Sequence, residues 1–447
     1  MERELSPSPN LSLEFVDDLN SRRICAGNLV IFLNGRMWYN EGTMDWEEEK
    51  MQEGFFLKEW KTSPVPDEFA KMFSLEEAGK VRKYHESFPV YSVTPLVRLQ
   101  NTARKLGVQK IYLKDESKRF GLNAFKALGG SWAIGKYLGQ CLKMDENNLT
   151  YGVLKDENTK KALGDITFVT ATDGNHGRGV AWAASQFGCK SVVYMPKGSA
   201  QERLLNIRKA GADASITDMN YDDCVRLSKK MADEKGWVVV QDTAWEGYEE
   251  IPAWIMQGYS TMALEAIEQM DEAPTHVFLQ AGVGSMAAAV ATVLLNAFKD
   301  TPPRIVIVEP NKADCFYKSA LSGCREFVTG DMNTIMAGLA CGEPCTTAWE
   351  ILKCASSAFV SCPDYAAAQG MRLLSKPGEG DERVVSGESG ASAFGCICEI
   401  LTDETLVSYK KALKIDENSR LLFFSTEGAT DTENYFAIVE NGAYPKK

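Results

Sequence analysis

The sequence lacks most features of proteins that bind nucleic acids or span membranes. Its formal net charge is −12, whereas a protein that binds phosphate backbones needs clustered Lys and Arg. The longest early apolar run, NLVIFL, is far too short to span a bilayer. We therefore expect neither a nucleic acid nor a membrane as a partner.

Histidine is scarce, and the cysteines lack the spacing of a metal site. The chain has 3 histidines and 12 cysteines; the tightest cysteine pairs are Cys341/Cys345 and Cys396/Cys398, and no Cys-x-x-Cys pair is repeated. Structural zinc sites use four closely spaced ligands. We therefore predict no metal and interpret the cysteines mostly as reduced core residues.

The amino-terminal stretch MERELSPSPNLSLEF is polar and lacks the apolar core of a signal peptide. Residues up to about Glu68 show no steady period. Together with the cysteine usage, this stretch predicts a cytoplasmic protein in a reducing setting.

From Val93 onward, apolar runs alternate with helix-length segments. The strand-like runs are KIYLKD, DITFVTA, CKSVVYM, DASITD, GWVVVQD, HVFLQAG, RIVIVEP and RLLFFST. Such alternation indicates βαβ units and mainly parallel sheets that are covered by helices. A chain of 447 residues is long enough for two or three domains. We predict an α/β fold with its ligand chemistry at the carboxyl ends of the strands.

One loop in such a position, GLNAFKALGGSWA, contains Lys126. This lysine follows Phe125 and precedes a glycine pair and a helical run, so we expect it at the start of a helix. Apolar surroundings disfavour an ammonium, lower its pKa and suit the amine to forming a Schiff base. For a lysine taken alone, an ordinary surface position is the alternative.

A second loop follows the strand HVFLQ and reads Gly282-Val283-Gly284-Ser285 before an apolar helix. Backbone N–H groups of a glycine loop and the positive end of a helix dipole can hold a phosphate. The loop lacks the G-x-G-x-x-G spacing and the GK[ST] of nucleotide sites, which disfavours NAD and ATP. A tight turn without a ligand is the alternative.

Two further loops carry polar groups at strand ends. In TDGNHGRGV, Asn175 can present its amide to a ligand oxygen; a plain Asn-Gly turn would explain Gly174 and Asn175 but not Asp173. At the end of LLFFST, the hydroxyl of Ser425 or Thr426 can bind a ring nitrogen or cap a helix. A lysine for an aldehyde, a glycine loop for a phosphate and a hydroxyl for a pyridine together predict pyridoxal phosphate as the cofactor.

These loops, in this order, resemble the fold type II family of pyridoxal-phosphate enzymes, which includes the serine and threonine dehydratases. The resemblance rests on SVTPLVRL, YLKDES, Lys126, Asn175, Gly282 to Ser285, and Thr426. It implies two domains of tryptophan synthase β-like architecture, each built on a mainly parallel, helix-covered sheet. The large, cofactor-binding domain would comprise residues 1–130 and 245–447, and residues 131–244 would form a small, mobile domain. It also implies a homodimer.

Four tracts are similar to one branch of that family, whose members eliminate ammonia from D- and L-2,3-diaminopropionate to give pyruvate. They are RFGLNAFKALGG, TDGNHGRGVAW, DTAWEGYEEIPAWIMQGY and STEGATD. The dehydratases usually carry a serine or threonine where this chain has Asp173. The resemblance therefore implies a carbon-nitrogen lyase of amino-acid catabolism that acts on a small amino acid.

The same resemblance implies a role for each site residue. Lys126 would form the Schiff base and, once released, act as a base on its own face of the cofactor. Asn175 would contact the ring hydroxyl and Thr426 the pyridine nitrogen. The phosphate would lie on Gly282, Val283, Gly284 and Ser285, and the substrate on Thr172, Asp173, Gly174, His176 and Asp242.

Diaminopropionate explains why acids are expected in the site. An amine leaves as neutral ammonia only if it is protonated, and a carboxylate can bind the cationic side chain and exchange that proton. Asp173, on the face opposite Lys126, would remove the α-proton of the D-enantiomer, and Asp242 would bind or protonate the β-amine. Turn capping by Asp242 and plain packing of His176 are the structural alternatives.

Three readings remain beside the ammonia-lyase. Serine or threonine dehydration and β-replacement use the same cofactor, but a dehydratase needs only a neutral hydroxyl near the leaving group. A non-catalytic scaffold that binds an amino acid would be expected to lose the lysine or one acid.

The loop SGESGASA, from Ser386 to Ala393, either borders the pocket or simply begins a helix.

Overall fold

A computed structural model describes residues 31–33, 36–38, 54–172 and 174–446. It divides into a unit from Met1 to Glu47 and a unit from Glu48 to Lys447. In the first unit, β1 (Ile31–Leu33) pairs antiparallel with β2 (Arg36–Trp38), so the described end of the run NLVIFL is a strand. All other described elements belong to the second unit.

The larger sheet of the second unit has seven strands among the described residues, in the order β3-β12-β11-β10-β13-β5-β4. The five inner strands are parallel to one another, and the edge strands β3 and β4 are antiparallel to their neighbours. The strands are β3 (Phe56–Glu59), β4 (Leu96–Arg98), β5 (Lys110–Asp115), β10 (His276–Gln280), β11 (Arg304–Pro310), β12 (Ser356–Cys362) and β13 (Arg420–Ser425).

The smaller sheet has four parallel strands within the described ranges, in the order β8-β7-β6-β9. They are β6 (Thr167–Ala171), β7 (Lys190–Met195), β8 (Asp213–Ile216) and β9 (Val238–Val239). All four lie within residues 131–244, and every strand of the larger sheet lies outside that range. The proposed domain bounds themselves stay a prediction.

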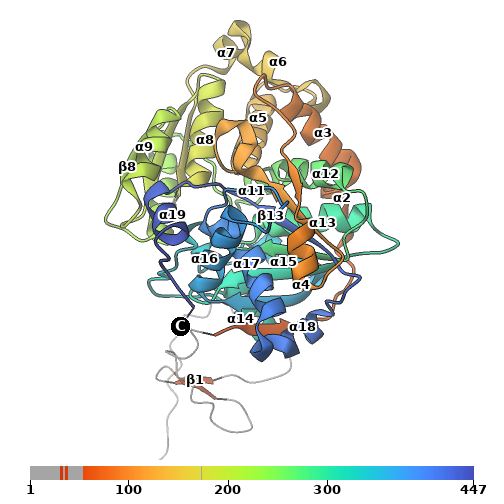
Figure 1. Cartoon of the computed structure of the whole chain (residues 1–447). Coiled ribbons are helices and arrows are strands. Elements are labelled where there is room, and N and C mark those ends of the chain that lie inside the picture. The colour runs from red at the N-terminus through yellow and green to blue at the C-terminus, as the bar shows by residue number, and fades with distance from the viewer. Residues whose placement is uncertain (1–30, 34–35, 39–53, 173, 447) are drawn as a thin grey trace, which may run out of the picture. The chain divides into compact units, whose positions relative to one another are not determined.

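Helices cover both sheets, which confirms the predicted α/β class (Figure 1). The helices up to α10 are α2 (Asp67–Met72), α3 (Leu75–Glu86), α4 (Gln100–Leu106), α5 (Ala127–Cys141), α6 (Tyr151–Lys155), α7 (Glu157–Leu163), α8 (Asn175–Gln186), α9 (Gln201–Lys209) and α10 (Tyr221–Lys235). The later ones are α11 (Glu250–Gly258), α12 (Ser260–Gln269), α13 (Ser285–Ala297), α14 (Cys315–Ser322), α15 (Thr346–Ala355), α16 (Asp364–Ser375), α17 (Glu388–Thr402), α18 (Val407–Leu413) and α19 (Thr432–Val439). Short 3₁₀ turns are η1 (Glu116–Gly121), η2 (Glu146–Asn148), η3 (Ala337–Leu339) and η4 (Glu404–Leu406).

The inner strands of the larger sheet are rich in apolar residues and are buried on both faces, as in sheets that helices cover on both sides. Because successive side chains of a strand point to opposite faces, Leu422 and Phe424 of β13 join the core cluster that includes α13 and α15. Leu421 and Phe423 join the cluster on the other side, with residues of α16 and α17. Buried Cys362, Cys396 and Cys398 lie in this second cluster, consistent with their reading as core residues.

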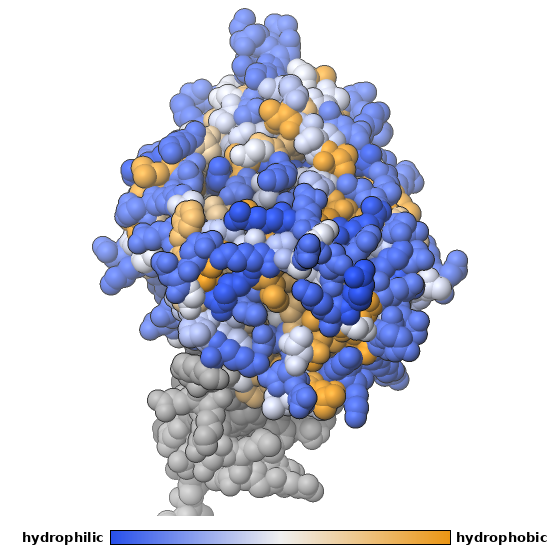
Figure 2. Space-filling model, viewed as in Figure 1, coloured by the Kyte–Doolittle hydropathy of each residue, from blue (hydrophilic) through white to orange (hydrophobic). Residues whose placement is uncertain are grey.

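The surface shows no large apolar belt in the view of Figure 2, where hydrophilic side chains predominate and apolar ones form small groups. Among the described residues, none of the helices has the length and apolar character needed to cross a bilayer.

Candidate active site

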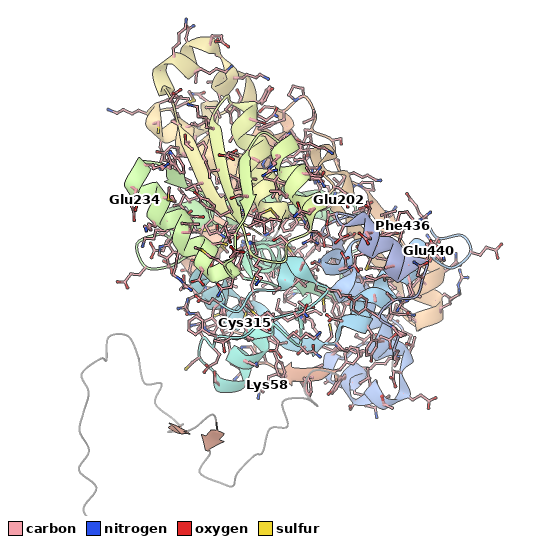
Figure 3. All side chains as sticks on the ribbon, turned by 90° about the vertical axis from the view of Figure 1, so that its left-hand side faces the viewer. Lys58, Glu202, Glu234, Cys315, Phe436 and Glu440 are labelled. Carbon is pink, nitrogen blue, oxygen red and sulfur yellow. The ribbon has the colours of Figure 1, made fainter. Side chains whose placement is uncertain are left out.

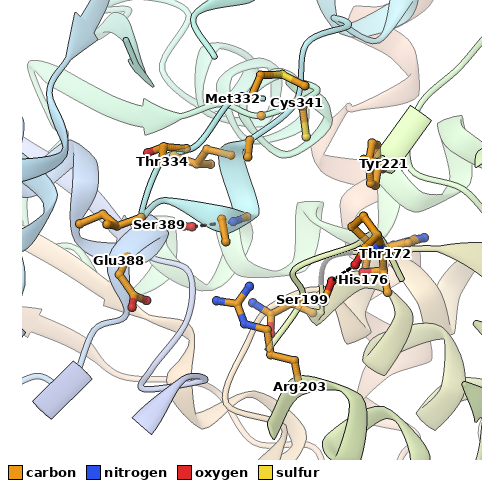
Figure 4. A pocket seen from close by; sticks show the side chains of 18 of the residues that line it. Thr172, His176, Ser199, Arg203, Tyr221, Met332, Thr334, Cys341, Glu388 and Ser389 are labelled. Atoms are coloured by element: carbon orange, nitrogen blue, oxygen red, sulfur yellow. Dashed lines mark hydrogen bonds between the residues drawn. The ribbon is translucent and has the colours of Figure 1, made fainter. Parts of the chain in front are cut away.

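A cavity of about 1320 Å³ lies where the two sheets present the carboxyl ends of their strands. Its walls include residues that directly follow β6, β10 and β13, namely Thr172, Ala281 and Thr426. Figure 4 shows Thr172, His176 and Tyr221 on one side of it and Thr334, Glu388 and Ser389 on the other. This position agrees with the rule that ligands of open parallel sheets bind beyond the carboxyl ends of the strands.

Lys126 lines this cavity and is the residue directly before α5, at the start of a helix as the sequence predicted. Its backbone is fixed from two sides. The neighbouring Phe125 N–H donates to the Thr426 carbonyl (3.1 Å). In α8, an added Cβ at Gly179 would lie 2.9 Å from the carbonyl carbon of Lys126, so only a glycine allows this close approach.

The Lys126 ammonium donates to Oδ2 of Asp242 at 2.5 Å. Asp242 is 3% exposed and follows β9 of the smaller sheet, whereas Lys126 lies in the segment that follows β5 of the larger sheet. The ion pair therefore joins segments that follow strands of the two sheets. Nδ1 of His176 lies 3.6 Å from the same carboxylate oxygen, while its Nε2 is 2.8 Å from the Val240 carbonyl oxygen. His176 therefore packs beneath the loop and also faces the acid.

This ion pair corrects the expectation that the pKa of Lys126 is lowered. Burial acts in that direction, but the charge of Asp242 and its hydrogen bond outweigh burial and raise the pKa of Lys126 above its ordinary value. Burial would raise the pKa of Asp242, yet His176 and Lys126 lower it to about 2. Burial lowers the pKa of His176, and Lys126 is the cation that donates a hydrogen bond to Asp242.

The glycine loop lies beside this pair. Gly282 to Ser285 line the cavity, and Ser285 begins α13, so the positive end of that helix points at the loop. The Ser285 hydroxyl donates to the Asp242 backbone carbonyl (2.7 Å), which ties the loop to the ion pair. Gly284 has φ +87°, and a Cβ there would lie 2.3 Å from the Phe316 ring.

Thr426 directly follows β13 at the cavity, and Gln280 orients its hydroxyl. The Gln280 amide donates to Thr426 Oγ1 (3.0 Å) and to the Phe424 carbonyl (2.9 Å). Since Thr426 Oγ1 accepts one hydrogen bond here, its own hydrogen can point to a ligand. Oε1 of Gln280 is buried and has no hydrogen-bond partner among the described residues.

The loop that contains Asn175 is described except for Asp173. Asn175 is the first residue of α8, lines the cavity, and donates through Nδ2 to Oε2 of Glu427. Thr172 lines the cavity, and its Oγ1 accepts the backbone N–H of Gly174 (2.9 Å). Gly174 itself lies beside the Arg203 side chain. The predicted roles of Asp173 lie outside the described residues.

Among the side chains that line this site, the sequence did not single out Gln280, Glu388 or Glu427. Glu388 and Ser389 from the start of α17 line the cavity, so SGESGASA both borders the pocket and begins a helix. The tract STEGATD gave a weak signal for Glu427, because an acid directly after Thr426 is unusual beside a predicted anionic ligand. For Gln280, the sequence indicates no role in the site beyond its position at the end of β10.

The described residues fit pyridoxal phosphate. An amine, a glycine loop at a helix N-terminus, and a hydroxyl held by an amide surround one cavity that is large enough for the cofactor and an amino acid. The buried Gln280 oxygen, which has no hydrogen-bond partner among the described residues, points to a polar ligand.

Sequence comparison agrees with this geometry. The model of the family described as pyridoxal-phosphate dependent enzyme matches residues 88–412. This chain therefore belongs to the family of pyridoxal-phosphate dependent enzymes, and the cofactor prediction is confirmed.

Within this family, the relatives are more specific. The diaminopropionate ammonia-lyase of Salmonella typhimurium is 51% identical over 370 residues, 81% of this chain and 92% of that protein. The Escherichia coli K12 diaminopropionate ammonia-lyase is 49% identical over 381 residues, 84% of this chain and 94% of that protein. The crystal structure of the Escherichia coli enzyme in complex with D-serine covers 88% of this chain and 99% of its own, at 45% identity and a TM-score of 0.82. The resemblance seen in the four sequence tracts, to the diaminopropionate ammonia-lyases, is confirmed.

Proposed function

We propose that this chain is a carbon-nitrogen lyase that converts D- and L-2,3-diaminopropionate and water to pyruvate and two ammonia molecules. The observation that carries the proposal is the Lys126–Asp242 pair, held beside an anion-binding loop in one cavity. About half of the aligned residues are identical to those of two diaminopropionate ammonia-lyases, over more than nine-tenths of the length of each relative. This similarity supports the same activity.

Pyridoxal phosphate, when bound, withdraws electrons from the substrate α-carbon and so makes its proton acidic. Gly282 to Ser285 would hold the phosphate, Thr426 the pyridine nitrogen and Asn175 the ring oxygen. The Lys126 amine would attach the cofactor and, once displaced by the substrate amine, would remove the α-proton from its own face.

Asp242 is well suited to the second amine of the substrate. Its pKa of about 2 makes it a carboxylate at neutral pH. In the described structure it faces the Lys126 ammonium, and the β-ammonium of the substrate can take that place. A carboxylate here favours diaminopropionate over serine, which has no second cation, and can exchange the proton that leaves with ammonia.

We assign to Asp173 the removal of the α-proton of the D-enantiomer, from the face opposite Lys126. Asp173→Asn should retain cofactor binding and lose most activity, with a larger loss for the D-substrate. Initial rates with the separate enantiomers check this, and an equal loss for both would contradict the assignment of two faces.

Domain organisation, assembly and location complete the proposal. Residues 1–130 and 245–447 would form the large domain and residues 131–244 a small, mobile one. The active form would be a cytoplasmic homodimer. The placement of the two sheets in these ranges supports the domain assignment.

Pyruvate release tests the activity. The cofactor-loaded protein, coupled to lactate dehydrogenase, should release pyruvate from D- and L-diaminopropionate at rates at least about tenfold above those with serine or threonine, since a desolvated charge contact is worth about 1.5–3 kcal/mol. Faster turnover of serine or threonine would favour a dehydratase. No pyruvate from any of these amino acids, despite bound cofactor, would favour a non-catalytic scaffold.

A further inference from the structure

Glu427 is a buried carboxylate in the cavity wall. It directly follows Thr426 and is 2% exposed. Because burying a carboxylate is costly unless it is hydrogen-bonded, its contacts indicate what it does.

The first contact is with Asn175. Oε2 of Glu427 accepts a hydrogen bond from Asn175 Nδ2, across 252 positions of the sequence. Glu427 belongs to the segment after β13 of the larger sheet, and Asn175 begins α8 after β6 of the smaller sheet. The hydrogen bond therefore joins the two sheets at the cavity.

The remaining contacts fix the carboxylate itself. Oε1 accepts the backbone N–H of Ser389 in the first turn of α17 (3.1 Å), and Oε2 also accepts from Thr430 Oγ1 (3.3 Å). The positive end of the α17 dipole favours a negative charge at this point. The backbone carbonyl of Glu427 accepts the Gly387 N–H (2.9 Å), so the residue is fixed at main chain and side chain.

An amide side chain can be placed in two orientations that differ in which end carries the donors. A carboxylate has only acceptors, so an Asn175 turned around would set its own oxygen against Oε2 of Glu427. Glu427 therefore selects the orientation in which Nδ2 faces it, and the second N–H of that nitrogen remains for the cavity. A ring oxygen that carries negative charge needs such a donor.

We infer that Glu427 is a positioning residue that fixes the Asn175 amide so that a donor, and not an acceptor, faces the cofactor ring oxygen. This inference rests on the proposed function, since it assumes that Asn175 contacts the cofactor. In this role Glu427 acts on the cofactor only through the Asn175 amide.

A double-mutant cycle on cofactor binding tests the inference. Glu427→Gln keeps the size of the side chain but can pair with either end of the Asn175 amide. It should weaken pyridoxal-phosphate binding about tenfold, the value of one hydrogen bond to a charged group, and shift the visible absorption band. In the Asn175→Ala background the same change should have less than about a twofold further effect, because the two residues act as one unit.

The control is Glu440→Gln, which removes an exposed carboxylate that accepts from Lys376 Nζ (3.0 Å) outside the cavity. It should leave the affinity and the absorption band unchanged. A parent-like Glu427→Gln protein, or an undiminished effect of this change in Asn175→Ala, would overturn the inference.

The reciprocal variant Asn175→Asp/Glu427→Gln separates positioning from plain structural support. It restores the hydrogen bond with reversed polarity, because the new amide can donate to the new carboxylate, but it presents an acceptor to the cofactor. Thermal stability should return to that of the parent while cofactor binding stays weak; recovery of both would make Glu427 merely structural. If the parent protein itself binds no pyridoxal phosphate, the proposed function fails, whereas a parent that binds it and releases pyruvate isolates any failure to Glu427.

Discussion

Single side chains in this protein acquire their properties from distant partners. Lys126 illustrates this, because its apolar, glycine-flanked sequence predicts a lowered pKa, and the structure reverses the direction. The reason is Asp242, which lies 116 positions further along the chain and reaches the amine at 2.5 Å. The types of residue could be read from the sequence, but the charge state of the amine depends on a long-range ion pair.

Asp242→Asn tests the role of this acid. The substitution preserves the shape of the side chain and removes the charge that faces Lys126 and, in the proposed function, the substrate β-amine. Turnover of diaminopropionate should fall by about 100-fold or more, the usual contribution of one acid-base group, with a smaller loss for serine. Side-by-side kinetics check this, and equal losses for both substrates would mean that Asp242 does not recognise the β-amine.

Glu388 predicts a pH dependence of stability. Burial and the neighbouring Glu427 raise the pKa of Glu388 from 4.5 to about 7, although Arg203 and Asn434 act in the opposite direction. Between these two values the folded protein holds a proton that the unfolded chain has lost, so stability falls as the pH rises through this window and the cost is complete above pH 7.

The variant Glu388→Gln removes this cost. It should be more stable than the parent at pH 8, by up to about 3 kcal/mol at about 1.36 kcal/mol per pKa unit, and similar to it near pH 4. Thermal or urea unfolding at both values measures the difference. A constant difference between variant and parent over this range would show that Glu388 does not titrate there.

Among the secondary-structure elements, those with long apolar runs were predictable and the others were not. All eight strand-like runs contain a strand, and KIYLKD and RIVIVEP match β5 and β11 end to end. The missed strands are β2, β3, β4 and β12. The sequence of β12, SSAFVSC, is fully buried but is interrupted by serines. The hydroxyls of Ser357 and Ser361 find partners only in the fold, on the Ile305 carbonyl (2.9 Å) and on Asp314 (2.8 Å).

The loop before α13 depends on glycine at one position. Gly284→Ala should lower stability by about 2 kcal/mol or more, because a Cβ there is strained at φ +87° and would meet the Phe316 ring. It should also weaken pyridoxal-phosphate binding. Unfolding and cofactor titration measure both effects.

Gly79→Ala is the matched control. Gly79 lies inside α3 with no atom within 4 Å of an added Cβ, so this change should stabilise the protein by about 0.5–1 kcal/mol and leave cofactor binding unaltered. Equal behaviour of the two alanine variants would contradict the role of the Gly284 turn.

In the second unit as a whole, residues spread over more than 300 positions meet at one cavity because two parallel sheets present their carboxyl ends to it. This convergence could be predicted from the sequence, since strand ends and polar loops are local features. The contacts that join the sheets could not. Besides the Asn175–Glu427 bond, Glu202 of α9 accepts from the Thr432 hydroxyl at the start of α19 (2.8 Å); Figure 3 labels Glu202 on α9 and Phe436 on α19.

Reductive fixation of the cofactor tests whether the lysine, the loop and the acids form one site. The cofactor-loaded protein is treated with borohydride and digested, and the peptide that carries the phosphopyridoxyl group is sequenced. The modified residue should be Lys126, and Lys126→Ala should carry no fixed group and release no pyruvate. A phosphopyridoxyl group on another lysine of the parent protein would contradict the proposed site.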